Sequence, residues 1–138
     1  MKREQHIIQN TRTPEGVHEF TVLGVNKADE SIGNYAIITG KLPSGKIEQV
    51  FLNRRPYGNQ RETFADSAIF AICDQLEEQN INIPADFDSD DLVLVETVFK
   101  GATVKAYCVH TQTTDGKTYA NISFNVNDTA VQAMLQMA

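Results

Sequence analysis

The sequence predicts a mainly β protein in which one central helix separates three strands from two. Apolar and polar residues alternate in five segments with the period of a half-buried strand, whereas residues 63–79 repeat with helical period. The chain has 138 residues, of which 41% are apolar and 22% charged, and this suits one globular domain. We therefore expect a single domain over residues 1–138.

Three strands are predicted in the first part of the chain, over residues 17–25, 34–42 and 47–53. The first contains Gly24, where we expect a bulge or a sharp bend. The second and third are separated by a Pro-Ser-Gly-Lys loop, which has the length and the glycine of a hairpin. These strands should form an antiparallel meander.

The central helix is predicted over residues 63–79, because apolar residues recur four positions apart and Thr63 can cap the first turn. The apolar run Leu92–Phe99 suits either a buried strand or a short helix, so its type stays open. Residues 102–110 and 117–126 are then expected to form a second hairpin around an Asp-Gly turn.

The two ends of the chain carry weaker patterns. Residues 1–15 show no periodicity before a turn signal, and we expect them to form a flexible arm. Residues 127–138 are expected to form a short C-terminal helix, which Asn127 or Asp128 can cap.

This order of elements is that of a five-stranded antiparallel OB-fold barrel, with its helix between strands 3 and 4. A small α+β domain with a helix packed on a curved sheet would give the same order. We take the OB-fold as the expected architecture.

Charge is unevenly distributed along the chain. The net charge of -6 argues against nucleic-acid binding by the molecule as a whole. However, residues 62–99 hold ten acidic and no basic groups, whereas residues 1–61 sum to +3 and residues 100–138 to +1. A polyanion could bind these flanking segments and avoid the centre, where the acidic helix residues are best explained as a solvated face.

Strand alternation places aromatic and basic residues on one face of the predicted sheet. The opposite face is aliphatic and should line the barrel. The aromatic and basic face holds Tyr35, Phe51, Tyr107, Tyr119, Lys41, Lys105 and Lys117. Rings stack on bases and ammonium groups neutralise phosphates, so this pattern favours single-stranded nucleic acid. An exposed tyrosine opposite a lysine is also common on any sheet, because tyrosine favours strands.

The loop after the third strand, residues 53–61, is the most basic stretch of the chain. It contains Arg54, Arg55 and Arg61 around Tyr57. Guanidinium groups beside an aromatic ring suit phosphate binding and base stacking together. The alternative is a basic lead-in that pairs with the acidic helix.

The sequence contains no pattern of a catalytic, cofactor or metal site. Its three histidines are scattered, and neither Cys73 nor Cys108 has a partner at metal-ligand spacing. The glycine-rich signatures of nucleotide-binding loops do not occur. We expect no enzymatic activity, no cofactor and no metal. No window approaches the roughly 18 apolar residues that cross a bilayer, so we expect a cytoplasmic protein with no membrane partner.

Two segments carry a family resemblance. Residues 99–124, FKGATVKAYCVHTQTTDGKTYANISF, resemble the end of the small single-stranded DNA-binding proteins of bacteriophages and related mobile elements. Residues 33–46, GNYAIITGKLPSGK, together with VFLN are similar to the second and third strands of the same proteins. The chain departs from their pattern in having no tryptophan, and from cellular single-strand binders in ending AVQAMLQMA rather than in an acidic tail.

The resemblance implies an OB-fold that coats single-stranded DNA during phage replication or recombination. It also implies a dimer or larger homo-oligomer, contacts with replication or recombination proteins, and no enzymatic activity. The binding strands would supply Tyr35, Lys41 and Phe51, and the final hairpin Lys105, Tyr107, Lys117 and Tyr119.

Two other functions fit the same residues. In a phage structural or assembly protein, the aromatic face would be a subunit interface, since tyrosine, phenylalanine and arginine are enriched there. In an OB module that binds oligosaccharides or small ligands, Tyr35, Tyr107 and Tyr119 would stack on sugar rings.

Overall fold

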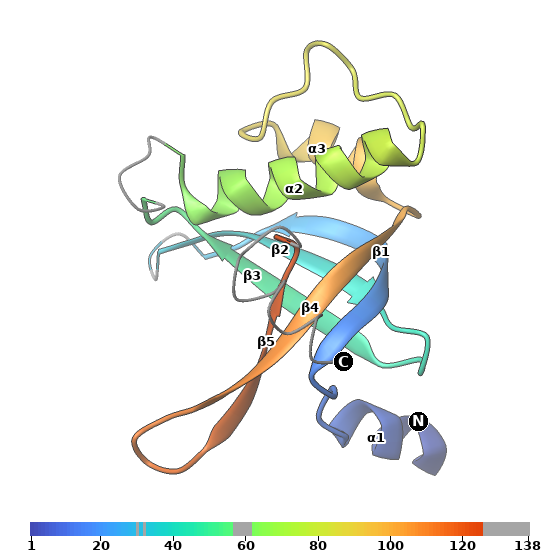
Figure 1. Cartoon of the computed structure of the whole chain (residues 1–138), viewed down its shortest axis with the longest axis vertical. Coiled ribbons are helices and arrows are strands. Elements are labelled where there is room, and N and C mark those ends of the chain that lie inside the picture. The colour runs from blue at the N-terminus through green and yellow to red at the C-terminus, as the bar shows by residue number, and fades with distance from the viewer. Residues whose placement is uncertain (30, 32, 57–61, 126–138) are drawn as a thin grey trace.

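The structure is a computed structural model that describes residues 1–29, 31, 33–56 and 62–125. It is mainly β, as predicted, with a five-stranded antiparallel sheet that has two helices at one end and the N-terminal helix at the other (Figure 1). The elements are α1 (Arg3–Asn10), β1 (Gly16–Lys27), β2 (Asn34–Lys41), β3 (Ile47–Asn53), α2 (Phe64–Glu78), α3 (Leu92–Phe99), β4 (Thr103–Gln112) and β5 (Thr118–Ser123). The expected C-terminal helix over residues 127–138 lies outside the described residues.

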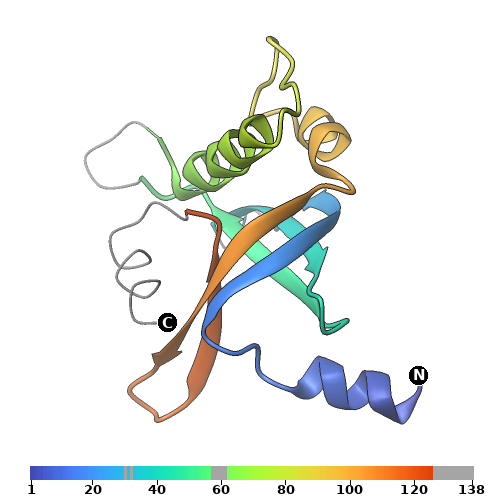
Figure 2. The same cartoon turned by 45° about the vertical axis from the view of Figure 1, so that its right-hand side comes forward.

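The strand order in the sheet is β3-β2-β1-β4-β5, which is compatible with an OB-like fold. The long strand β1 is central, and its pairing with β2 shifts register between Val22 and Gly24. This is the predicted bulge, and it lets the sheet curl into a half-barrel (Figure 2). Among the described residues β3 and β5 are the two edge strands, so the barrel is open between them.

Both predicted hairpins are confirmed, and they use the same turn. Leu42 N–H donates to the Lys46 carbonyl over 2.9 Å, and Gly45 adopts a positive φ of 92°. In the second hairpin Thr113 N–H donates to the Lys117 carbonyl over 2.8 Å. A positive φ is costly for residues with a Cβ atom, which explains the glycine that each loop carries.

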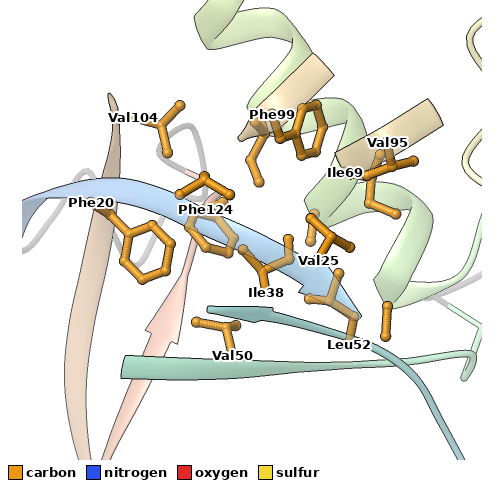
Figure 3. Packing of buried hydrophobic residues seen from close by; sticks show 14 of the residues in the cluster. Phe20, Val25, Ile38, Val50, Leu52, Ile69, Val95, Phe99, Val104 and Phe124 are labelled. Carbon is orange, nitrogen blue, oxygen red and sulfur yellow. The ribbon is translucent and has the colours of Figure 1, made fainter. Parts of the chain in front are cut away.

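Helix α2 covers one end of the half-barrel, where the core is packed (Figures 1 and 3). Thr63 caps it as predicted, since its side chain accepts from Asp66 N–H. The core also contains Phe20 and Phe124, whose rings meet edge to face at 5.1 Å. Gly40 makes room for Phe20, because a Cβ atom there would lie 2.1 Å from the ring. The buried residues of α2 are Ala65, Ala68, Ile69, Ile72, Cys73, Gln75 and Leu76.

The open assignment of Leu92–Phe99 is resolved as helix α3. Asp91 caps it by accepting from Leu94 N–H, and Val95 and Phe99, four residues apart, are fully buried. Glu96, next to Val95, accepts the N–H of Val25, which directly follows the bulge of β1. Helical spacing of the buried residues and this cap explain why the run is not a strand.

The N-terminal region differs from the expected arm, because it holds helix α1. This helix has no buried residue, but Gln9 is bonded to the backbone of Ile47 through both of its amide atoms. Thr13, between α1 and β1, is 2% exposed and contacts Glu48 of β3 and His110 of β4. Sequence periodicity did not predict the structure of this region, because contacts with other segments hold it in place. No helix in the described ranges is both long and apolar enough to span a bilayer.

Candidate nucleic-acid interface

Phe51 and Lys41 lie on the outer face of the sheet, as predicted from alternation. Phe51 is 54% exposed and lies opposite Ile37 of β2. Lys41, also exposed, is four residues further along β2 on the same face, with Thr21 of β1 as its other neighbour. Lys41 on β2 therefore lies closer to the β2–β3 turn than Phe51 on β3 does.

Lys105 and Tyr119 continue this series on the other side of β1. Lys105 is exposed opposite Glu19, which precedes Thr21 by two residues in β1. Tyr119 is 49% exposed and lies opposite Thr111, six residues beyond Lys105 in β4. Each step moves the same way along the strands, so these side chains form a diagonal series. We call it the outer-face track (Phe51, Lys41, Lys105 and Tyr119).

Further cations lie at the two ends of the track. Lys117 is exposed in the β4–β5 turn, which projects away from the half-barrel (Figure 1). At the other end Arg54 and Arg55 follow β3 directly, and both are exposed. Tyr57 and Arg61, which the sequence also predicts as contacts, lie outside the described residues.

Tyr35 is not on the exposed face, contrary to the prediction. The pairing of β2 with β3 shifts between Asn34 and Ala36, and this turns Tyr35 into the core, where it is 4% exposed. Its hydroxyl donates to the Ser89 carbonyl over 2.7 Å, and burial raises its pKa. The Arg54 guanidinium lies 3.9 Å from the ring centroid, a cation–π contact. Tyr35 therefore positions Arg54 and cannot stack on a base.

Tyr107 is the second correction. Its pairing with Val17 and Ser123 puts it on the outer side of β4, as alternation predicts, yet it is only 1% exposed. Burial raises the pKa of its hydroxyl, which has no hydrogen-bond partner among the described residues. Alternation gives the side of the sheet on which a residue lies, but not whether other chain segments cover it. Tyr107 is therefore unavailable for stacking.

A chain of hydrogen bonds joins the start of β2, where Arg54 packs on Tyr35, to α2. The Ser89 hydroxyl donates to Asp66 over 2.6 Å, while the Ser89 carbonyl accepts from Tyr35. Burial raises the pKa of Asp66, but bonds from Ser89 and Thr63 and the charge of Arg54 outweigh it, so the pKa is lowered. This link places a guanidinium at the junction of β3, α2 and the loop before α3.

The surface beside this junction is acidic. A groove of about 730 Å³ runs between the end of β1 and α3. Its charged lining residues are Asp88, Asp90, Asp91, Glu96, Lys27 and Arg54. Asp90 lies 3.6 Å from the Arg54 guanidinium. Carboxylates outnumber cations there, so the groove is unsuited to a phosphate backbone, and the side of Arg54 that faces it is already partnered.

Gln75 of α2 is a positioning residue that the sequence analysis missed. It is 7% exposed, and its side-chain amide donates to the Lys105 carbonyl over 2.9 Å while accepting from Lys105 N–H over 2.7 Å. The helix thereby holds the backbone from which one cation of the track projects. A polar residue at a core position of the helical stripe was the available signal.

Both cysteines are buried free thiols. Burial, together with Asp74 and Glu77, raises the pKa of Cys73 to about 12, and burial also raises that of Cys108. His110 lies near Cys108, but its ring bonds the carbonyl of Thr13. Within the described part of the chain, no group of three or more His, Cys, Asp or Glu side chains is placed to hold a metal ion.

The interface that remains from the predicted set comprises five side chains and two flanking arginines. The structure exposes Lys41, Phe51, Lys105, Lys117 and Tyr119, with Arg54 and Arg55 at one end. Comparison of the chain with known proteins adds no relative: no protein-family model matches it, and neither does any curated protein.

Proposed function

We propose that this protein binds single-stranded DNA without catalysis and with little sequence preference. The observation that supports it is the outer-face track, which crosses the whole sheet and in which two lysines lie between two exposed rings. A splayed single strand needs π faces for its bases and cations for its phosphates, and duplex DNA hides the base faces. The acidic helix and groove would repel the strand, so the path is confined to the track.

The wider setting of this proposal comes from the family resemblance. We place the activity in DNA replication or recombination of a phage or mobile element, in the host cytoplasm, with the protein acting as a homo-oligomer beside replication or recombination proteins. The oligosaccharide alternative is disfavoured, because two of its three stacking rings, Tyr35 and Tyr107, are buried.

The test is fluorescence anisotropy of a labelled oligo(dT) and of a duplex of the same length, titrated with protein at low and moderate salt. We expect tight binding to the single strand alone, with affinity that falls steeply as salt rises. Absence of binding at low salt would refute the proposal. Salt-insensitive self-association without DNA binding would instead favour the assembly-protein alternative, in which the track is a subunit interface.

A further inference from the structure

The edge strand β3 presents backbone groups that point away from its neighbour. Leu42 N–H donates to the Lys46 carbonyl, so this residue pair of the β2–β3 hairpin is hydrogen-bonded. Bonded and non-bonded pairs alternate along an antiparallel ladder. Ile47, Gln49 and Phe51 therefore belong to non-bonded pairs, and their N–H and C=O groups point outward from β2.

Both ends of this edge are already occupied. The Gln9 side chain bonds both outward groups of Ile47, at 2.7 and 3.0 Å. At the far end the Arg55 carbonyl accepts from Phe64 N–H over 2.9 Å. Within the described ranges no other hydrogen bond reaches the outward backbone groups between these points. The free stretch, which we call the edge window, consists of Gln49, Phe51 and Asn53. Asn53 keeps the alternation, because the extra residue at the register shift lies in β2 and the next N–H, of Arg54, donates inward to the Gly33 carbonyl.

The edge window lacks two features that protect sheet edges from pairing, a charged residue and a proline, and the extra residue at the register shift opposite its end belongs to β2. Proteins guard such edges with charged residues, proline or bulges. All three of its residues are uncharged, and none is proline. Phe51 exposes 54% of its surface there. The other edge strand differs, because β5 begins directly after Lys117.

We propose that the edge window binds the edge window of a second copy of this chain. Antiparallel pairing about a two-fold axis at Phe51 matches Gln49 with Asn53 of the second copy, so the window is complementary to itself. Three pairs of outward groups would form about six hydrogen bonds, two per pair. No charge repels across the pairing, although each chain carries a net charge of -6. Gln9 and Phe64 limit the contact to these pairs.

Pairing in this way joins two half-barrels into one continuous sheet. The two Phe51 rings would lie opposite each other as a cross-strand aromatic pair on the outer face. Each outer-face track begins at Phe51, so the tracks of the two copies would meet at the two-fold axis. The proposed function already includes a homo-oligomer; the inference adds the surface that joins the copies, and it does not require DNA.

The experiment is light scattering or sedimentation of the full chain without DNA. We expect a mass of two chains, each of 15.4 kDa. Gln49→Pro removes an outward N–H and blocks the edge, while sparing the ladder with β2. It should weaken the dimer about tenfold or more. The matched controls are Gln49→Thr, and Thr118→Pro, which makes the same change at an outward N–H of β5; both should remain dimeric.

A charge-swap pair keeps the test decisive if the proline variant does not fold. Phe51→Lys and Phe51→Glu should each be monomeric, because like charges meet at the axis, and an equimolar mixture should restore the two-chain mass. A one-chain mass for the unaltered protein at tens of micromolar, or a dimer that survives Gln49→Pro, overturns the inference. Loss of the dimer in Thr118→Pro alone would assign the contact to β5 and also overturn it.

This inference and the proposed function can fail separately. A monomeric protein that still binds oligo(dT) would overturn the β3 interface and leave the DNA proposal intact. A dimer that Gln49→Pro disrupts but that does not bind oligo(dT) would support the β3 interface and refute the DNA proposal.

Discussion

Gly40 shows how strongly one missing side chain shapes the interior of the half-barrel. The Phe20 ring occupies the space beside its Cα atom, and the ring also packs edge to face on Phe124. Phe20 and Phe124 are at most 1% exposed, so neither can move aside towards solvent. The lack of a side chain at Gly40 of β2 therefore leaves the space that the buried Phe20 ring of β1 fills.

We expect Gly40→Ala to destabilise the protein by about 1–3 kcal/mol, because the new methyl group would overlap the ring. Urea unfolding followed by circular dichroism measures this. Thr39→Ala, at the neighbouring outward position, is the control and should change the free energy of unfolding by less than about 0.5 kcal/mol. Equal effects of the two substitutions would contradict the packing argument.

The Gln75 amide carries a second residue-level prediction. Gln75→Leu removes both partners of the Lys105 backbone and leaves its N–H and carbonyl unpaired. We expect a loss of about 1–3 kcal/mol in the free energy of unfolding. The control is Asp74→Ala, at the exposed position next to Gln75. A neutral Gln75→Leu variant would mean that water replaces the lost bonds.

Two tyrosines that alternation predicts to be exposed are buried, each for a different reason. Alternation assigned Tyr35 and Tyr107 to an exposed face, but a register shift turned the first inward and the second is covered. Lys41, Phe51, Lys105, Lys117 and Tyr119 are exposed as predicted, because they lie in regular ladder positions or in a turn. A bulge within a strand and long-range cover leave no mark on local periodicity.

At the level of elements, the N-terminus of α2 depends on an ionised carboxylate. The pKa of Asp66 in the fold is below its ordinary value of 3.8. The carboxylate therefore stabilises the fold above pH 3.8, and this contribution is lost as pH falls from 3.8 through the folded pKa. The loop before α3 shares the loss, since Ser89 bonds the same group.

We expect Asp66→Asn to lower the free energy of unfolding by about 1 kcal/mol at pH 7. The difference from the unaltered protein should shrink as the pH is lowered below 3.8. Urea unfolding at pH 7, 4 and 3 gives the comparison, with Asp74→Asn on the same helix as the control. A difference that is constant over this range would exclude the titration of Asp66 as its source.

The two buried thiols, Cys73 in α2 and Cys108 in β4, should be unreactive in the folded protein. With the pKa of Cys73 at about 12 and that of Cys108 raised, almost no thiolate forms at pH 8. Neither cysteine should react with a disulfide reagent until the protein unfolds, when both should react. Labelling with and without urea, followed by absorbance, measures this. Rapid labelling of the native protein would show that one of these elements opens locally.

The sequence predicted the elements whose pattern is local and left the others open. The strands, both hairpins and the capped helix α2 follow from alternation, glycine turns and Thr63. The type of α3 stayed open because a run of eight residues, six of them apolar, suits two structures. Helix α1 buries no residue, and its eight residues hold only two apolar side chains, Ile7 and Ile8, which are too few to show a periodicity.

For the whole molecule, the placement of charge leads to a prediction about salt. If Lys41 and Lys105 each neutralise a phosphate, the double variant Lys41→Gln/Lys105→Gln should lower the slope of log K against log salt by about 1.4, at roughly 0.7 per phosphate on single strands. Lys100→Gln, an exposed lysine at the end of α3 and off the track, should leave the slope unchanged. Anisotropy with oligo(dT) at several salt concentrations decides it.

The position of β1 between β2 and β4 also determines when the molecule can be completed during synthesis. One edge of β1 pairs with residues that follow within about twenty positions, but the other waits for Thr103–Gln112. The Cys108 thiol that bonds the Thr13 carbonyl is 95 residues away from it in the chain. A ribosome must therefore release most of the polypeptide before β1 is sheltered on both sides. Such distant pairing makes folding slow, and a nascent chain halted before β4 would expose an open β1 edge to aggregation.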